Sequence, residues 1–359
     1  MGYVVCSDAV TPVELATRTA EAGIPLGLAG APALGDFAIA TSADGRRAYV
    51  VTSNGVVPGT GQAAGGVVSP ASGRGAPTTT GPPVPPSGVG VQNVVVPVDL
   101  ATQTAARPIE IPGQGGTHAI VVLPGGRTVL AASGSTIVPV DAISRRVGTP
   151  LDLGPGHTIF GMVLDPRGAT LYALVAGGVF PVDTAKDTAG VEIPTGLSVS
   201  SVYSPHGIAV TGDGATLYVV GQGGTDFGGR VLPIVASTGA TQPATGFDRF
   251  GIADPAALAI TPDGSSLLVV DSANNWVNPV PLATFSDPPP PVRLPQQTAA
   301  ASTSGTQHPT DIVLGPGRTG AFIVDGFDAV RPYDPGSQTF GRAIPVCSGA
   351  ASMAVAPAP

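Results

Sequence analysis

Pro97-Val98-Asp99, which ends the apolar run Val94-Val95-Val96, belongs to a short motif that recurs along the whole chain. In each copy, proline precedes Val, Ile or Tyr. The seven copies are Pro12-Val13-Glu14, Pro97-Val98-Asp99, Pro139-Val140-Asp141, Pro181-Val182-Asp183, Pro233-Ile234-Val235, Pro279-Val280-Pro281 and Pro332-Tyr333-Asp334. After the first interval, which carries a long insertion, they recur every roughly 40 to 50 residues. If the chain is read as a circle, the interval from the last copy to the first falls in the same range.

The residues before each motif predict two strands joined by a tight turn. An apolar stretch such as residues 206–210 leads to Gly212-Asp213-Gly214, and then to the β-rich run Leu217-Tyr218-Val219-Val220. Glycine allows positive φ in such a turn, and aspartate hydrogen-bonds its own backbone there. The turn recurs at Asp44-Gly45, Gly125-Gly126, Arg167-Gly168, Asp213-Gly214 and Asp263-Gly264, with a looser version at Pro316-Gly317. Four residues after each of the first five glycines stands a Tyr or Leu, at Tyr49, Leu130, Tyr172, Tyr218 and Leu268.

A further strand follows each motif, as in Pro108-Ile109-Glu110-Ile111-Pro112. Each repeat therefore holds four strands, with the proline motif in the third. Repeats of several strands at this period are typical of propellers, in which each repeat forms one blade around a common axis. The sequence thus predicts an all-β fold, a seven-bladed β-propeller with four antiparallel strands per blade, called A to D from the axis outward.

The two ends of the chain share one predicted blade. Tyr3-Val4-Val5 is already a strand B, so the first strand A is missing, and residues 351–355 supply it from the C-terminus. We therefore expect the ring to be closed by the C-terminal strand joining the N-terminal blade, which removes open sheet edges. Cys6 and Cys347, the only cysteines, then lie on the same face at this seam. They form either a disulfide or two small buried residues.

The state of these cysteines bears on localisation. A disulfide indicates an oxidising compartment, so the protein is expected to be extracytoplasmic or at the cell surface, as a mature form without its export signal. Without the bridge, a cytoplasmic location is expected. No run of 18 apolar residues occurs, so we expect no membrane span.

Composition favours one large domain. Of 359 residues, 51 are Gly and 39 are Pro, while 11% are charged, which suits short strands and tight turns. No break in composition divides the chain, so we expect a single domain over residues 1–359. Residues 54–90, rich in Gly, Pro, Ser and Thr, interrupt the second blade as a disordered insertion or as a lid. The net charge of -8 argues against a nucleic-acid surface, and we expect a monomer.

The repeats resemble the YVTN-type seven-bladed β-propeller repeat family, with Tyr49-Val50-Val51-Thr52-Ser53-Asn54 and Leu217-Tyr218-Val219-Val220 as the closest matches. The resemblance covers nearly the whole chain and implies the fold. Related seven-bladed families include lactonase-like and streptogramin-lyase-like enzymes as well as proteins with no known reaction. No motif matches outside the repeat, so the resemblance implies no catalytic residues.

In a propeller, the B–C loops and D–A connectors share one face, here called the loop face, on which ligands usually bind. The A–B and C–D turns share the opposite face, here called the turn face. All four histidines fall at the start of a strand A, on the loop face: His118, His157, His206 and His308. Their offsets from the A–B turns differ, so they do not form a symmetric ring. We interpret them as hydrogen-bonding residues between blades, with an organic-ligand site or a transition-metal site as alternatives.

Charged residues share the loop face with the histidines. The ligand-binding candidates are the four histidines together with Asp36, Asp226, Arg230, Asp254, Asp271 and Asp325. An isolated loop aspartate is usually a turn former. No calcium loop, His-Glu-x-x-His motif or Gly-x-Ser-x-Gly elbow occurs, so we predict no catalytic or metal-ligating residues and no cofactor.

These observations predict a scaffold that binds a small molecule, a glycan or a protein at the channel mouth. The alternative is a lactonase-like or ring-opening lyase-like enzyme. In that enzyme, His118 or His206 would act as the general base, with or without a divalent metal.

Overall fold

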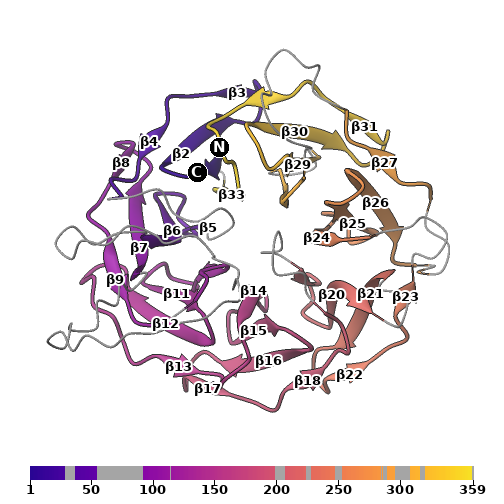
Figure 1. Ribbon diagram of the computed structural model, residues 1–359, viewed down its shortest axis with the longest axis horizontal. Helices are drawn as coiled ribbons and strands as arrows, with labels where there is room; N and C mark the ends of the chain where they lie inside the picture. Colours follow the sequence, from indigo (N-terminus) through magenta and orange to yellow (C-terminus); the bar gives the residue numbers. More distant parts are fainter. Residues whose placement is uncertain are drawn as a thin grey trace, which may run out of the picture.

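The computed structural model describes residues 1–28, 37–54, 92–113, 115–198, 207–223, 228–246, 253–283, 285, 289–295, 308–315 and 320–357. Every regular element in these ranges is a strand, and the strands form seven antiparallel sheets arranged in a ring (Figure 1). This confirms the predicted seven-bladed β-propeller. The expected insertion at residues 54–90 lies, from residue 55 onward, outside the described residues.

The first three blades, each given from strand A outward, include the sheet that joins the two chain ends. The first contains β33 (Ser352–Val355), β1 (Gly2–Val5), β2 (Ala9–Glu14), β3 (Thr19–Ala20) and β4 (Ile24–Pro25). The second contains β5 (Phe37–Thr41), β6 (Arg47–Asn54), β7 (Gln92–Asp99), β8 (Thr104–Ala105) and β9 (Ile109–Ile111). The third contains β10 (Ile120–Val122), β11 (Thr128–Ser133), β12 (Thr136–Asp141) and β13 (Leu151–Asp152).

The remaining four blades repeat the same order. The fourth contains β14 (Ile159–Leu164), β15 (Thr170–Val175), β16 (Gly178–Asp183), β17 (Thr188–Ala189) and β18 (Ile193–Pro194). The fifth contains β19 (Ile208–Val210), β20 (Thr216–Gly223), β21 (Gly228–Val235), β22 (Ala240–Thr241) and β23 (Thr245–Gly246). The sixth contains β24 (Pro255–Ile260), β25 (Ser266–Asp271), β26 (Trp276–Pro281) and β27 (Val292–Arg293). The seventh contains β28 (Asp311–Leu314), β29 (Ala321–Val324), β30 (Ala329–Asp334), β31 (Thr339–Phe340) and β32 (Ile344–Pro345).

The recurrent proline lies in strand C and faces the outer strand. The carbonyl of Pro181 accepts a hydrogen bond of 2.7 Å from the amide of Gly190, beyond β17. Because the N and O atoms of a strand residue point to the same side, the N–H that proline lacks would also face strand D. Proline therefore removes no hydrogen bond between strands B and C. The hydrogen bond that it cannot donate would have gone to strand D, the edge strand. Strand D consists of two short pieces in five of the blades.

Each C–D turn contains one residue in the left-handed region, four positions after the end of strand C. In β16, for example, Asp183 ends the strand and accepts hydrogen bonds of 3.0 Å from the amides of Ala185 and Lys186, and Asp187 has φ of 52°. We call this the left-handed turn position. It is occupied in the seven blades by Arg18, Gln103, Arg145, Asp187, Gly239, Phe285 and Gln338.

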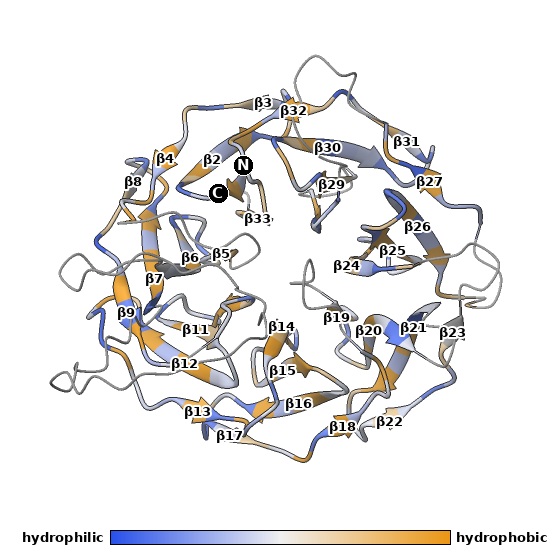
Figure 2. Ribbon diagram, viewed as in Figure 1, coloured by the Kyte–Doolittle hydropathy of each residue, from blue (hydrophilic) through white to orange (hydrophobic). Residues whose placement is uncertain are grey.

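The apolar core lies between neighbouring blades rather than within one central mass. In each blade the middle strand B places an aromatic or leucine side chain toward the following blade, with the strand C proline as its cross-strand neighbour. These pairs are Tyr3–Pro12, Tyr49–Pro97, Leu130–Pro139, Tyr172–Pro181, Tyr218–Pro233, Leu268–Pro279 and Phe322–Pro332. Many strands accordingly carry apolar segments, drawn in orange in Figure 2.

Ring closure follows the predicted scheme. β33 pairs antiparallel with β1, with Tyr3 opposite Ala354 and Val5 opposite Ser352. Cys6 and Cys347 form a disulfide with a Cα–Cα distance of 5.9 Å, which confirms the predicted bridge at the seam.

Candidate functional site

Seven of the ten residues that the sequence predicted for binding are described, and they lie on the loop face. His206, Asp36 and Asp226 lie outside the described residues. The others belong to three regions of the ring: His118 and His157 around the third and fourth blades, Arg230 in the fifth, and the remaining four in the sixth and seventh blades. The described candidates of the sixth and seventh blades are Asp254, Asp271, His308 and Asp325.

His118 and His157 contact aromatic rings of the fourth blade. The imidazole of His118 stacks on Phe160 of β14, with ring centroids 5.8 Å apart and planes inclined by 15°. The Nδ1 atom of His157 lies 2.9 Å from the carbonyl oxygen of Leu153, and its ring meets the edge of Phe180 at 5.1 Å. Both imidazoles are half-buried, so they combine a contact between neighbouring blades with access to solvent.

Asp271 ends β25 and organises the loops of the sixth blade. Its side chain is fully buried. Its carboxylate accepts hydrogen bonds from the amides of Ala253 at 3.1 Å and Asp254 at 3.3 Å, and from the side-chain amide of Asn274 at 2.8 Å. Burial raises the pKa of Asp271, and these hydrogen bonds counteract part of that rise. One carboxylate thus holds both the D–A connector and the B–C loop of this blade.

Asp325 directly follows β29 in the seventh blade and corresponds in position to Asp271. It is fully buried, and its Oδ1 atom accepts hydrogen bonds from the amides of Phe327 at 3.2 Å and Ala329 at 3.1 Å. The Nε atom of the buried Arg331 lies 3.6 Å from its Oδ2 atom. Burial raises the pKa of Asp325, while the amides and the guanidinium lower it. The carboxylate therefore shapes the 325–329 loop from inside.

These loops meet at the junction of the sixth and seventh blades. The Nδ1 atom of His308 lies 3.2 Å from the carbonyl oxygen of Ser272, and the Ser272 hydroxyl donates to the Asp254 carboxylate at 3.1 Å. A Cβ on Gly326 would lie 2.1 Å from the His308 carbonyl oxygen, so the loop after Asp325 packs directly against His308. We call Asp254, Asp271, Ser272, His308 and Asp325 the blade 6–7 cluster.

The blade 6–7 cluster lacks the geometry of a metal centre. Within the described ranges, no three His, Cys, Asp or Glu side chains are arranged to hold a metal ion. Nothing helical in those ranges has the length and hydropathy needed to cross a bilayer. The direct role of each nominated residue in ligand binding stays a prediction.

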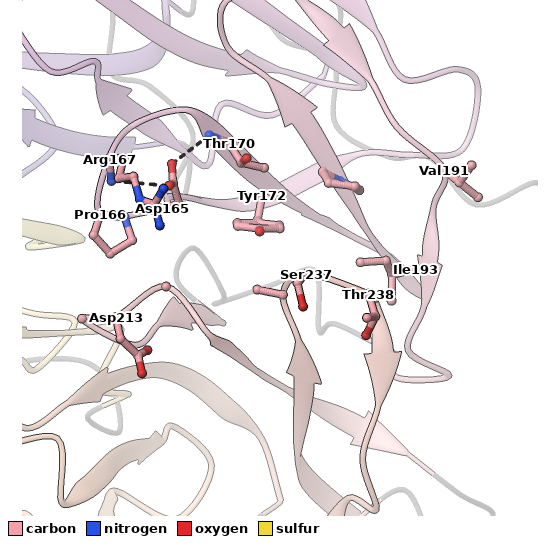
Figure 3. Close-up of a pocket in the computed structure, with 15 residues that line it drawn as sticks. Asp165, Pro166, Arg167, Thr170, Tyr172, Val191, Ile193, Asp213, Ser237 and Thr238 are labelled. Carbon is pink, nitrogen blue, oxygen red and sulfur yellow. Dashed lines mark hydrogen bonds between the residues drawn. The ribbon is translucent and has the colours of Figure 1, made fainter.

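A concave region lies on the turn face, where the sequence predicted no site. It is a groove of about 780 Å³ between the fourth and fifth blades, which we call the blade 4–5 groove (Figure 3). Its lining includes Asp165, Pro166, Arg167, Tyr172, Pro181, Val191 and Ile193 of the fourth blade, and Asp213, Ser237, Thr238 and Gly239 of the fifth. Burial raises the pKa of Tyr172, and the Asp165 carboxylate raises it further.

Comparison with known proteins agrees with the fold. No protein-family model and no curated protein matches this chain. Among solved structures, it is similar to the hydrazine synthase of Kuenenia stuttgartiensis, with 16% identity over 90% of each chain and a TM-score of 0.63. It is also similar to the periplasmic gluconolactonase of Pseudomonas aeruginosa, with 15% identity over 98% of this chain and 97% of that chain and a TM-score of 0.62. A functionally unknown protein from Desulfotomaculum acetoxidans gives 13% identity over 99% and 98% of the two chains and a TM-score of 0.60. Likeness at these identities shows the fold, a seven-bladed β-propeller.

Proposed function

We propose that this protein is a binding scaffold whose ligand or partner contacts the loop face at the blade 6–7 cluster. The observation that carries the proposal is the burial of two carboxylates, Asp271 and Asp325, against the backbone of the loops around them. Holding a loop rigid before its partner arrives lowers the entropic cost of binding. His308 and Asp254 would contact the partner, and Asp271 and Asp325 would act as positioning residues.

The contrast with other blades supports this choice. In the third and fourth blades, strands B and C are joined by two-residue turns, between Ser133 and Thr136 and between Val175 and Gly178. The B–C loop of the sixth blade is longer, since Asp271 pairs with Trp276. Burying a carboxylate is costly unless its oxygens are well paired. A loop that served only to reverse the chain direction would not need a buried carboxylate.

The test is a binding screen with matched variants on opposite faces. Immobilised full-length protein is exposed to panels of glycans, peptides and small metabolites, and each ligand found is titrated against His308→Ala, Asp254→Ala and Asp334→Ala. The first two changes remove groups of the cluster, whereas Asp334 lies in a C–D turn on the turn face, outside the lining of the blade 4–5 groove. We expect at least a tenfold loss of affinity in the cluster variants and none in Asp334→Ala. Ligands whose affinity is the same in all three variants would refute the proposed site.

A lactonase-like activity is the competing proposal, because one similar structure is a periplasmic gluconolactonase. His118 is the described candidate base, and its stacking on Phe160 would hold the imidazole in one orientation. Hydrolysis of gluconolactone by the purified chain, compared with His118→Ala, distinguishes the two functions. A scaffold should give the same rate as buffer in both samples, with or without added divalent metal.

Two further proposals concern family and location. The recurrence of a Tyr or Leu four residues after the A–B turn supports membership in the YVTN-type repeat family. The Cys6–Cys347 disulfide supports an oxidising, extracytoplasmic location. Fractionation of the native cells, with alkylation before lysis, tests the second proposal, because free thiols in the native protein would contradict it.

A further inference from the structure

In the first three blades, the left-handed turn position carries a side chain that reaches back to the preceding blade in the ring. The Gln103 side-chain amide donates a hydrogen bond of 2.6 Å to Glu21 of the first blade. The Arg145 guanidinium donates to the carbonyl of Arg107 in the second blade. The Arg18 guanidinium of the first blade lies 2.7 Å from where a Cβ on Gly341 of the seventh would stand. In these blades, the position covers the seam between neighbours.

In the sixth blade this position is Phe285, which fills the seam with an aromatic ring. The ring centroid lies 5.9 Å from that of Tyr218 in the fifth blade, and the cross-strand partner of Tyr218, Pro233, is buried. Phe285 has φ of 42°, a backbone conformation that a bulky residue rarely adopts. The packing of Phe285 against Tyr218, at the seam between the fifth and sixth blades, therefore compensates for the energetic cost of its positive φ.

In the fifth blade the same position is Gly239, and the seam is open. The turn itself is unchanged, since Gly239 N donates to Val235 O at 2.8 Å as Phe285 N donates to Pro281 O at 2.9 Å. The facing pair in the fourth blade, Tyr172 and Pro181, is equivalent to Tyr218 and Pro233. Without a side chain over it, Pro181 is only half-buried, and the blade 4–5 groove lies there.

The walls of the groove suit an aromatic side chain that belongs to a polypeptide. Tyr172 and Ile193 form an apolar floor, and the rim residue Val191 is 87% exposed. Figure 3 shows Asp165, Arg167 and Asp213 at the opposite end from Val191, with Ser237 and Thr238 across from Tyr172 and Ile193. The ring would lie over the apolar floor, and the charged and hydroxyl groups around it would meet the polar backbone on either side of the ring.

We propose that the blade 4–5 groove is a docking site for a partner polypeptide that inserts an aromatic side chain from a turn. The occupant is inferred from the molecule itself, because Phe285 shows which group fits the equivalent seam one blade further on. The groove lies on the turn face, so this site is separate from the blade 6–7 cluster and does not depend on the proposed function.

The probe is a cyclic peptide containing Leu-Ala-Thr-Phe-Ser, the sequence of residues 282–286. Its control is the same peptide with alanine in place of phenylalanine, and N-acetyl-phenylalaninamide represents a small aromatic ligand. Binding to the full chain is followed by NMR titration. We expect the phenylalanine peptide to bind at least tenfold more tightly than either control. Equal affinity for the two peptides, or tighter binding of N-acetyl-phenylalaninamide, would overturn the proposal of a polypeptide partner.

Two variants test the location of the site. Gly239→Phe should fill the groove as Phe285 fills its neighbour and should weaken peptide binding at least tenfold. A Cβ there would lie 3.1 Å from Ile193 Cγ1, so the Ile193 side chain has to shift slightly. Asp187→Phe adds the same ring at the left-handed turn position of the fourth blade, away from the groove, and should leave binding unchanged.

A third variant decides the matter even if Gly239→Phe does not fold. Phe285→Gly should open the seam between the fifth and sixth blades and create a second site, so that each chain binds two peptides instead of one. Glycine is favoured at φ of 42°, so the turn should persist. One peptide per chain in Phe285→Gly, or unchanged binding by folded Gly239→Phe, would show that the left-handed turn position does not create the site.

Discussion

Asp311 of the seventh blade accepts a hydrogen bond of 3.1 Å from the hydroxyl of Ser352, which belongs to the last strand of the chain. The same carboxylate accepts hydrogen bonds from the amide of Met353 at 2.8 Å and from the amide of Ile312, the next residue in the chain, at 2.7 Å. Asp311 and Ser352 are both buried. The final strand is therefore held on two sides, by β1 in its own sheet and by Asp311 in the adjacent blade.

Replacing Asp311 by alanine should destabilise the ring at this seam. The change leaves the Ser352 hydroxyl and the Met353 amide without their buried acceptor, at an expected cost of about 3 kcal/mol in the free energy of unfolding. Urea denaturation followed by circular dichroism measures it. Asp334→Ala is the control, because that exposed carboxylate accepts hydrogen bonds from its own turn, including those from the amides of Gly336 and Ser337. Equal shifts in the two variants would mean that Asp311 contributes nothing special to closure.

Deletion of residues 349–359 removes β33 altogether. The inner edge of β1 then lacks its partner, and Met353 no longer packs against Val4 and Phe322 in the cluster between the seventh and first blades. Several buried side chains at roughly 1.5 to 3 kcal/mol each exceed the stability of an ordinary domain. The truncated protein should be insoluble or lack a cooperative melt. A truncated chain that melts like the full-length one would contradict the role of β33.

Reduction of the Cys6–Cys347 bridge should lower stability without changing the fold. The bridge links residues 341 positions apart, so loop-closure entropy in the chain-entropy model gives a contribution of about 6 kcal/mol in the absence of strain. Differential scanning calorimetry with and without reductant measures the loss. The double variant Cys6→Ala/Cys347→Ala should melt at the lower temperature in both buffers. A reductant-dependent shift in the double variant would point to another cause.

His308→Ala should weaken the junction of the sixth and seventh blades. The contact of its Nδ1 atom with the Ser272 carbonyl requires a proton on Nδ1, so the imidazole is the donor. Loss of this bond should cost about 1 kcal/mol. His308→Asn, whose side-chain amide can donate from nearly the same place, should recover most of the stability. If thermal melts of the two variants coincide, the hydrogen bond is not what matters at this position.

Acid should destabilise the protein below about pH 4, near the ordinary pKa of aspartate. Eight turn aspartates have a lowered pKa because their carboxylates accept hydrogen bonds: Asp44, Asp99, Asp141, Asp152, Asp183, Asp213, Asp263 and Asp334. For Asp263 the Thr261 hydroxyl and the Ser265 amide lower the pKa to about 2. Their stabilisation is present above the unfolded-state pKa and is lost as pH falls through the folded-state values.

Asp271 and Asp325 have the opposite effect, because burial raises their pKa. Their contribution is full below the unfolded-state pKa and is lost as pH rises through the raised values. The eight lowered groups outnumber these two, so the free energy of unfolding should fall from pH 4 to pH 2. Urea titrations at pH 5, 4, 3 and 2 test this, with Asp263→Asn as a variant whose acid limb should be shallower. Constant stability over this range would contradict the assignment.

The architecture was predictable because each blade repeats the same short sequence features. Pro181 and its counterparts mark strand C by their spacing alone, and Gly45 and its counterparts mark the A–B turn. The positions of Cys6 and Cys347 within their repeats also predict that both lie at the seam where the ring closes. The roles of Asp271 and Asp325 were not predictable in the same way. In the sequence they resemble any loop aspartate, and only the fold shows that both carboxylates are buried against backbone amides.

The blade 4–5 groove escaped sequence reasoning for a different reason. The groove arises because Gly239 has no side chain, and a single glycine in a turn does not form a recognisable motif. The signal was nevertheless present in the alignment of Val235-Ala236-Ser237-Thr238-Gly239 with Pro281-Leu282-Ala283-Thr284-Phe285. Once strand C is in register, Gly239 and Phe285 share one position, and the smaller residue marks the unfilled seam.

The pairing of β1 with β33 also fixes the order in which the sheets can be completed during synthesis. Tyr3 and Ala354 are cross-strand neighbours, yet the ribosome makes them about 350 residues apart. At translation rates of about 5 to 20 residues per second, the inner edge of β1 remains unpaired for roughly 20 to 70 seconds. The second to sixth blades can assemble on the emerging chain, whereas the sheet of the first blade stays incomplete until β33, the last strand, has been made. Until translation reaches β33, the nascent chain exposes a strand edge that other polypeptides can pair with, so this interval is when the protein most needs protection by a chaperone.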